Sequence, residues 1–492
     1  MSLTFWVAII GMVGIAVVAI RGRSKPHTDL AEWTVGKRNY GTLTMWFLQA
    51  GEAFTTFTFL GVAGIAFSAG AASSYAIPYI PLGYIGLFFI GPIVWRYAKD
   101  RSYITQADFF ADRYQSPWLG KIVAICGVVF LLPYLQLQIT GLGLIVKLVT
   151  GNATSGVISM VVATVLTVVF VLWAGIHGLA RTAYIKDALM IGAMALLIIV
   201  IPLHYAGGIS HVFESVAAMD EKLLTIQAGE YSQMWWLSSM LISAIGSAFL
   251  TLPHLWPPML AAKSARVIRS NNVYLSLYQV VIIFPLFIGF TALLVLPRDA
   301  ASNSVLLTLA REALPDWVTG LVAVAAASAA MIPAAALCIG ISTLVSHNLV
   351  RTKSMRTKLR INHFVVVIAA SLALVLGILR PDLLANLLLL TFAGLSQLAP
   401  GITAALPKQP IAQKASVLAG IVAGVAVVML FTFTGLPHAE IDPGILGLAA
   451  NVVVLMLTEA GLRATGRRPV AISTQPLRSI PEATEHPQEE SV

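Results

Sequence analysis

The chain has 492 residues, of which 58% are hydrophobic and only 11% are charged, with a net charge of +9. Soluble globular proteins carry about 25% charged residues, so this composition excludes a chain whose surface mainly faces water. The mean hydropathy is +0.84, and apolar runs recur along nearly the whole length. The sequence therefore predicts an all-α polytopic membrane protein rather than several soluble domains.

Apolar runs long enough to cross a bilayer, about 20 residues each, recur 13 times. We expect spans at 4–20, 42–70, 77–96, 122–149, 155–177, 187–206, 234–260, 273–297, 317–346, 361–379, 384–406, 415–433 and 444–463. The connections are mostly short. Two longer ones, 100–120 and 207–233, are expected to hold short interfacial helices.

The distribution of Lys and Arg predicts the orientation, because these residues collect on the cytoplasmic side. If the N-terminus is outside, 26 of the 31 basic residues fall on inside segments. Arg181 and Lys186 are counted there, on the connection before the sixth span. This predicts a bacterial inner membrane protein, with its N-terminus outside and its C-terminus in the cytoplasm.

The chain divides into a transmembrane transporter domain over 1–465 and a tail over 466–492. The tail is rich in Pro, Glu, Ser and Gln, a composition typical of disorder. No glycine-rich phosphate loop precedes a Lys-Ser or Lys-Thr pair, and neither Cys126 nor Cys338 has metal-ligand spacing. We therefore expect neither an enzyme nor a cofactor, no nucleic-acid partner, and transport driven by an ion gradient. The sequence carries no indication of the oligomeric state.

Two spans contain residues that interrupt a helix. The second span has Gly51, Glu52 and a Thr-rich run before Gly61, and the seventh has Pro253-His254 followed by Pro257-Pro258. Proline removes a backbone donor, and transporters bind solute where helices unwind near the bilayer midplane. The two spans are five helices apart and therefore antiparallel. This predicts an inverted repeat of helices 2–6 and 7–11.

The sequence resembles the sodium:solute symporter family, whose members have the LeuT-type fold. The resemblance is best over residues 30–350 and is carried by Gly51–Gly64, Gly178–Asp187, Pro253-His254, Ala261–Ser264 and Ala329–Met331. Within the family the chain is most similar to the bacterial monocarboxylate permeases, on Asp29–Trp33, Gly36, Gly41–Leu43, Trp46–Leu48, Tyr79 and Ala107–Phe109. That branch implies lactate, pyruvate, propionate or a similar acid as the solute.

The resemblance also implies a sodium site, and one half of it is altered here. Sodium-coupled members hold the ion with backbone carbonyls of helix 2, at Gly51 and Phe54 in this chain, and with two hydroxyls of helix 9. The hydroxyl positions are occupied by Ile332 and Pro333, which have no side-chain oxygen. A hard cation prefers oxygen ligands, so this departure argues against sodium coupling. The family pattern also implies an ion-exit role for Asp187.

Glu52 is the acidic residue deepest within a predicted span. Carboxylates are costly there and usually mark a pathway or a pair, so Glu52 is a candidate for proton coupling and solute contact. Thr55, Thr56, Gln138 and His254 are further candidates for solute contact. For each, a structural role in helix packing is the alternative. No Lys or Arg is predicted at the midplane.

These observations together predict a symporter that imports a small organic solute by alternating access. The solute expected is a short monocarboxylate and the coupling ion a proton. A sodium-coupled symporter of an amino acid, pantothenate or another small solute is the first alternative. A solute sensor that has lost transport is the second. Besides the solute, membrane lipid is the expected partner.

Overall fold

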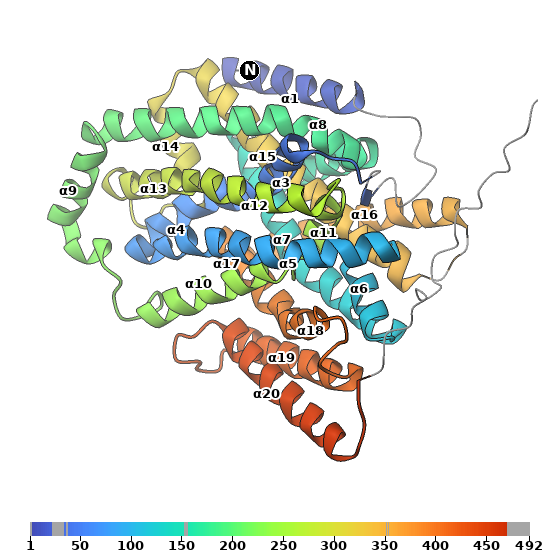
Figure 1. The fold of residues 1–492 in the computed structure, drawn as a ribbon. Coiled ribbons are helices and arrows are strands. Elements are labelled where there is room, and N and C mark those ends of the chain that lie inside the picture. Colours follow the sequence, from blue (N-terminus) through green and yellow to red (C-terminus); the bar gives the residue numbers. More distant parts are fainter. Residues whose placement is uncertain are drawn as a thin grey trace, which may run out of the picture.

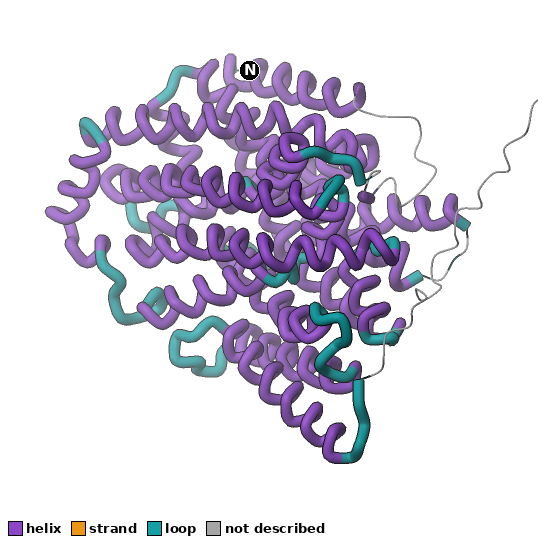
Figure 2. Tube along the Cα trace, in the orientation of Figure 1, coloured by secondary structure: helices purple, strands orange, loops and turns teal. Residues whose placement is uncertain are grey.

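The computed structural model describes residues 2–21, 34–35, 38–151, 156–350, 352 and 354–469. The predicted tail over 466–492 lies almost wholly outside these residues, as do Asp29–Trp33 and Gly36. Figures 1 and 2 show a bundle made of helices and short connections. Among the described residues, one isolated β-bridge joins Tyr40 and Ala262.

The first half of the bundle contains α1 (Leu3–Arg21), α3 (Thr42–Ala53), α4 (Val62–Ala69), α5 (Ala76–Arg101), α6 (Gln106–Arg113), α7 (Pro117–Thr150), α8 (Gly156–Ala206) and α9 (Ile209–Asp220). The second half contains α10 (Gln233–Ala248), α11 (Trp256–Leu260), α12 (Ala265–Tyr278), α13 (Ile283–Val295), α14 (Val305–Ala313), α15 (Asp316–Thr343), α16 (Met355–Leu379), α17 (Leu384–Leu395), α18 (Ala399–Ala405), α19 (Lys414–Thr434) and α20 (Pro443–Ala464).

Each of the predicted spans has a helical counterpart. Among the described residues, 11 helical segments are long and apolar enough to cross a membrane, and Leu3–Val18 is a shorter apolar helix. One of the 11, Phe57–Arg101, turns at the 3-10 segment Gly70–Tyr75 and so holds both the end of the second span and the third. Gly70 has φ +53°, and a Cβ there would lie 2.5 Å from the carbonyl oxygen of Leu223.

The predicted interruption of the second span is confirmed. Helix α3 ends at Ala53, and Phe54 is extended with φ −89° and ψ 93°. The chain becomes helical again through a π-helical turn, Phe57–Gly61, before α4. This geometry releases backbone groups from the helical ladder, which must then find partners elsewhere.

The predicted interruption of the seventh span is confirmed as well. Helix α10 ends at Ala248, Leu250 has φ +54°, and Pro253 begins a 3-10 turn that leads into α11. The side-chain amide of Gln106 donates to the carbonyls of Leu250 and Thr251, both at 3.0 Å. The indole of Trp256 also donates to Leu250, at 2.9 Å. Fixed side chains therefore stabilise this break.

The fifth and sixth spans differ from the prediction. We expected a connection between 177 and 187, but α8 remains helical from Gly156 to Ala206, over 51 residues. A straight helix of that length would measure about 76 Å, far more than the ~30 Å hydrocarbon core. Two windows of α8, Gly156–Trp173 and Gly178–Ala206, are each long enough to span. Helix-forming residues such as Leu179, Ala180, Arg181 and Ala183 explain why no loop forms.

Helix α15 forms the centre of the bundle, and α19 and α20 form its edge. Every residue in the apolar window of α15 is buried, whereas only 28% of the window of α19 and 17% of that of α20 are buried. In Figure 1, these last two helices lie together at the bottom of the view. Large exposed side chains such as Phe364, Leu379, Met456 and Leu457 fit an outer surface that faces lipid.

The short helix α6 anchors the predicted interfacial segment 100–120 to the π-helical turn Leu344–Leu349, which follows α15. Thr105 and Asp108 form a capping box at the start of α6, and Asp108 pairs with His347 at 3.1 Å. Burial alone would raise the pKa of Asp108. The charge of His347 and the hydrogen bonds from His347, Ile104 and Asn348 outweigh burial and lower it to about 2. Asp108 therefore stays ionised and holds α6 in place.

Close packing between α7 and α17 generates a testable prediction. A Cβ at Gly394 would lie 2.0 Å from the ring of Phe130, which is itself buried. Gly394→Ala should therefore lower the thermal unfolding midpoint of the detergent-purified protein, since overpacking costs about 1–3 kcal/mol. Gly192→Ala is the control, because no atom lies within 4 Å of the new Cβ. Equal midpoints for the two variants would contradict this packing.

Candidate solute and cation site

The two interrupted helices line one cavity. Glu52, Ala53, Thr55, Phe57 and Thr58 reach it from the first break, and Leu250, Leu252, His254 and Leu255 from the second. Its volume is about 90 Å³. One water needs about 10–15 Å³ of such space, so the cavity has room for several waters or one short organic solute. The meeting of two antiparallel, interrupted helices at one cavity is the arrangement that secondary transporters use.

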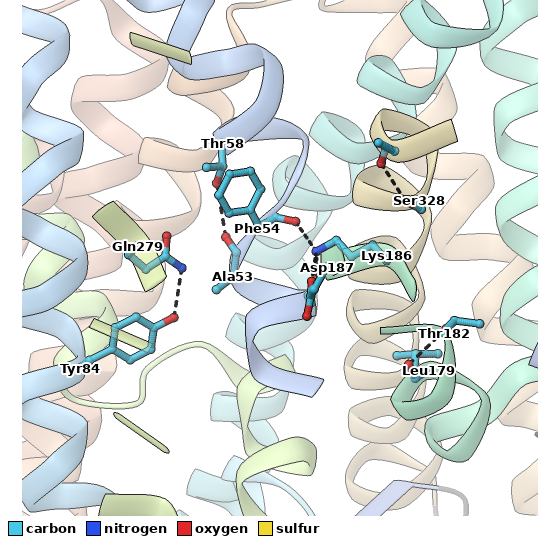
Figure 3. A network of polar contacts seen from close by, with 12 residues as sticks. Ala53, Phe54, Thr58, Tyr84, Leu179, Thr182, Lys186, Asp187, Gln279 and Ser328 are labelled. Carbon is cyan, nitrogen blue, oxygen red and sulfur yellow. Dashed lines mark hydrogen bonds and ion pairs between the residues drawn. The ribbon is translucent and has the colours of Figure 1, made fainter. Parts of the chain in front are cut away.

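Most of the cavity wall is apolar, with a few polar groups. Aromatic and aliphatic side chains from α5, α7, α11 and α17 form the apolar part: Tyr79, Ile80, Leu87, Tyr134, Met259, Leu388 and Phe392. Polar side chains include Gln49, Asn272 and Gln279. Figure 3 shows Gln279 bonded to Tyr84, with an N–O distance of 3.5 Å. Such a wall suits a solute with one polar end and a short aliphatic end.

Glu52 lies in the last turn of α3 and contributes the one carboxylate among the described residues that line the cavity. Its side chain is 3% exposed, and its Oε2 atom has no hydrogen-bond partner within the described chain. A buried, unpartnered carboxylate oxygen costs free energy. Glu52 is therefore placed to hold a proton or to bond a solute.

His254 lines the same cavity from the second break. Its ring contacts Tyr134 edge-on, with centroids 5.4 Å apart, and its Nδ1 atom has no partner among the described residues. Thr55 also reaches the cavity, although its hydroxyl already accepts a hydrogen bond from the backbone of Phe57 at 3.1 Å. Thr58 bonds the carbonyl of Ala53 at 3.3 Å across the break (Figure 3).

Two of the predicted solute contacts lie behind the cavity wall instead. Thr56 and Gln138 do not line the cavity. The Oε1 atom of Gln138 accepts hydrogen bonds from the backbone N–H of Thr56 at 3.3 Å and from its hydroxyl at 2.7 Å. Direct solute contact by Thr56 and Gln138 stays a prediction; in this structure their side chains point toward one another. Their role in this structure is to hold the first break in shape.

The break in the second span also holds a charged residue that the sequence reasoning placed elsewhere. Lys186 was counted on an exposed cytoplasmic connection, and that position is wrong, because its side chain is 0% exposed. Its ammonium donates to the carbonyl oxygens of Gly51 and Phe54, both at 2.7 Å. A carboxylate oxygen of Asp187 lies 3.3 Å away. Figure 3 shows the ammonium pointing into the break.

Three of the four residues predicted for ion coupling, Gly51, Phe54 and Asp187, therefore surround one ammonium group, whereas Glu52 lines the cavity. Gly51 and Phe54 contribute backbone oxygens, and Asp187 contributes its carboxylate. Gly51 allows this approach, because a Cβ there would lie 3.1 Å from that of Ala183. A signal for Lys186 was present in the sequence: it stands beside an opposite charge and directly before an apolar run. Because Lys186 was counted with the basic residues of a cytoplasmic loop, its position beside Asp187 was not used as an indication of burial.

Comparison with known proteins places this geometry in context. The sequence model of the sodium:solute symporter family matches residues 33–405. The uncharacterized symporter YhjB of Bacillus subtilis (strain 168) is 33% identical over 89% of this chain and 93% of its own length. The monocarboxylate transport permease protein of Rhizobium johnstonii is 30% identical over 67% of each chain.

Among solved structures, a substrate-bound, outward-open Na⁺-coupled sialic acid symporter superposes with a TM-score of 0.77. The match covers 93% of this chain and 97% of that protein, at 15% sequence identity. At this identity the likeness is one of fold, which is the LeuT-type fold with two inverted repeats of five helices. The first helix of each repeat is the interrupted one.

The contact between Gln138 and Thr56 generates a prediction for stability. In Gln138→Leu, two buried donors of Thr56 lose their acceptor, and each unsatisfied group costs about 1–3 kcal/mol. We expect a clear fall in the thermal unfolding midpoint of the detergent-purified protein. Gln227→Leu makes the same change at an exposed position and should leave the midpoint near that of the wild type. A variant at 138 as stable as this control would show that the pair does not hold the break.

Proposed function

Because the chain belongs to the sodium:solute symporter family, we propose that it imports a short monocarboxylate together with a proton. The family identifies a symporter of a small solute and not an enzyme. The acid and the proton are our proposal. Similarity to the Rhizobium johnstonii monocarboxylate permease supports the choice of solute. The cavity supports it too, because about 90 Å³ with a mostly apolar wall suits a small acid.

The observation that carries the proton is the position of Glu52. It is the one carboxylate lining the described cavity, and no Lys or Arg lines it. An anionic acid bound beside an ionised Glu52 would place two negative charges in one buried space, which is strongly unfavourable. A proton on Glu52 removes the repulsion and turns its unpartnered Oε2 into a donor for the solute carboxylate. The proton and the acid then bind together or not at all.

This coupling has an energetic consequence. One proton moving with one monoanion carries no net charge, so the pH difference drives uptake rather than the membrane potential. Each pH unit supplies about 1.4 kcal/mol, which corresponds to about tenfold accumulation of the acid. Uptake driven by such a pH difference does not require the carrier to hydrolyse ATP.

The proposed orientation places the N-terminus outside and the C-terminus in the cytoplasm of a bacterial plasma membrane. With Lys186 buried in the bundle, 25 basic residues remain on the segments assigned inside, against five outside. That asymmetry still supports the orientation.

Glu52→Gln tests the coupling. The amide of Gln does not take up or release a proton at these pH values. Accumulation of radiolabelled lactate driven by a pH step in proteoliposomes should therefore be lost. Exchange of labelled for unlabelled lactate at equal pH should persist, because the amide can still donate to the solute. Glu440→Gln, at an exposed position between α19 and α20, is the matched control. If Glu52→Gln accumulated as much lactate as the control after a pH step, the proposal would be contradicted.

Two alternatives make different predictions in the same vesicles. A sodium-coupled symporter of an amino acid, pantothenate or another solute would respond to a sodium jump without a pH step. A sensor that has lost transport would bind solute and show neither uptake nor exchange. A panel of labelled acids, amino acids and sugars in the exchange assay separates these outcomes from proton-coupled uptake of a monocarboxylate.

A further inference from the structure

The break between α3 and α4 creates a place for a cation inside the protein. The carbonyl groups of the last turn of a helix have no intrahelical partners, and the C-terminal end of a helix carries a partial negative charge. Gly51 and Phe54 present such carbonyls at the end of α3. In a membrane domain, exposed carbonyls of this kind need a donor or a positive ion from the protein or from solution.

The residues around this place do not fit a sodium ion. The family resemblance implies two hydroxyls from α15, and the residues there are Ile332 and Pro333, both buried and without side-chain oxygens. The two backbone carbonyls are already engaged, each by a hydrogen bond from Lys186. A metal ion at the same carbonyls would have to displace that ammonium.

The surroundings of Lys186 match the charged form of its side chain. An ammonium has three N–H donors and no acceptor. The carbonyl oxygens of Gly51 and Phe54 accept hydrogen bonds from Nζ at 2.7 Å, and a carboxylate oxygen of Asp187 forms an ion pair with it at 3.3 Å. The side chain is fully buried, so these groups replace water as its ligands. The negative charge of Asp187 compensates the buried positive charge.

We propose that the ammonium of Lys186 is the resident cation of this break and takes the place of a dissociable sodium ion. The helix end is then stabilised by a charge that is covalently attached to α8. The carrier needs no sodium at this position in any state in which the contact persists. This inference deepens the proposed function and rests on it in one respect: with no sodium at the break, the proton at Glu52 is left as the coupling ion.

The first test uses the purified wild-type protein without solute. We expect its thermal unfolding midpoint to be the same in sodium chloride and in choline chloride at equal ionic strength. A ligand that binds only the folded state raises the midpoint. A sodium-specific rise in the wild type would therefore overturn the proposal.

The second test removes the ammonium. Lys186→Ala leaves a space bounded by the carbonyls of Gly51 and Phe54 and by the Asp187 carboxylate, three oxygen ligands that suit a hard cation. We expect this variant to be less stable than the wild type in choline chloride and to regain stability in sodium chloride. Lys186→Met is the matched control, because it loses the charge and keeps most of the volume. It should be destabilised to a similar extent and gain nothing from sodium.

The outcomes remain informative if Lys186→Ala does not fold in choline chloride. Purification in sodium chloride should then recover folded protein for Lys186→Ala and not for Lys186→Met. Equal behaviour of the two variants in both salts would contradict the proposal. These readouts involve no solute and no pH gradient, so their failure is distinct from a failure of proton-coupled monocarboxylate uptake, which the Glu52 variants test.

Discussion

The hydrogen bonds from Lys186 to the carbonyl oxygens of Gly51 and Phe54 are the contact on which the rest of the site depends. They join α8 to the end of α3 at the point where α3 stops being helical. An unwound segment inside a membrane protein is tolerated only where its freed backbone groups find partners. With this contact in place, the chain can turn at Phe54 and direct Glu52 and Thr55 toward the cavity.

The second break is held by different means. There, the amide of Gln106 and the indole of Trp256 donate to the freed carbonyls of Leu250 and Thr251. These donors are neutral, whereas the donor at the first break is an ammonium. A β-type bridge, in which the backbone of Tyr40 bonds Ala261 and Lys263, connects the start of α3 to the end of α11. The two interrupted helices are therefore tied together at one end and separated by the cavity farther along.

Much of the architecture follows from the sequence, because bilayer thickness fixes how long an apolar run must be. The spans, the two interruptions and their antiparallel relation were all predictable from apolar runs and from the positions of Gly and Pro. The continuous helix α8 was not, because the residues around Arg181 and Lys186 are polar enough to suggest a loop and yet good helix formers. Only the packing of α8 against α3 decides that Lys186 is buried.

The candidate site was predictable in part for a similar reason. Glu52 and His254 were identifiable because polar side chains within a span are costly and therefore conspicuous. Thr56 and Gln138 were equally conspicuous, but no sequence pattern distinguishes a side chain that faces a cavity from one that bonds its neighbour. The replacement of the family hydroxyls by Ile332 and Pro333 indicated that the sodium site is altered. The cation that stands at the break became evident only in three dimensions.

The claim that Lys186, and not sodium, occupies the break is tested most directly by an experimental structure of the protein in sodium chloride. Its resolution must separate an ion from a side-chain terminus. We expect the side-chain density of Lys186 to end within hydrogen-bond distance of the carbonyl oxygens of Gly51 and Phe54, with no separate ion between them. A separate ion at those carbonyls, with Lys186 turned away, would contradict it.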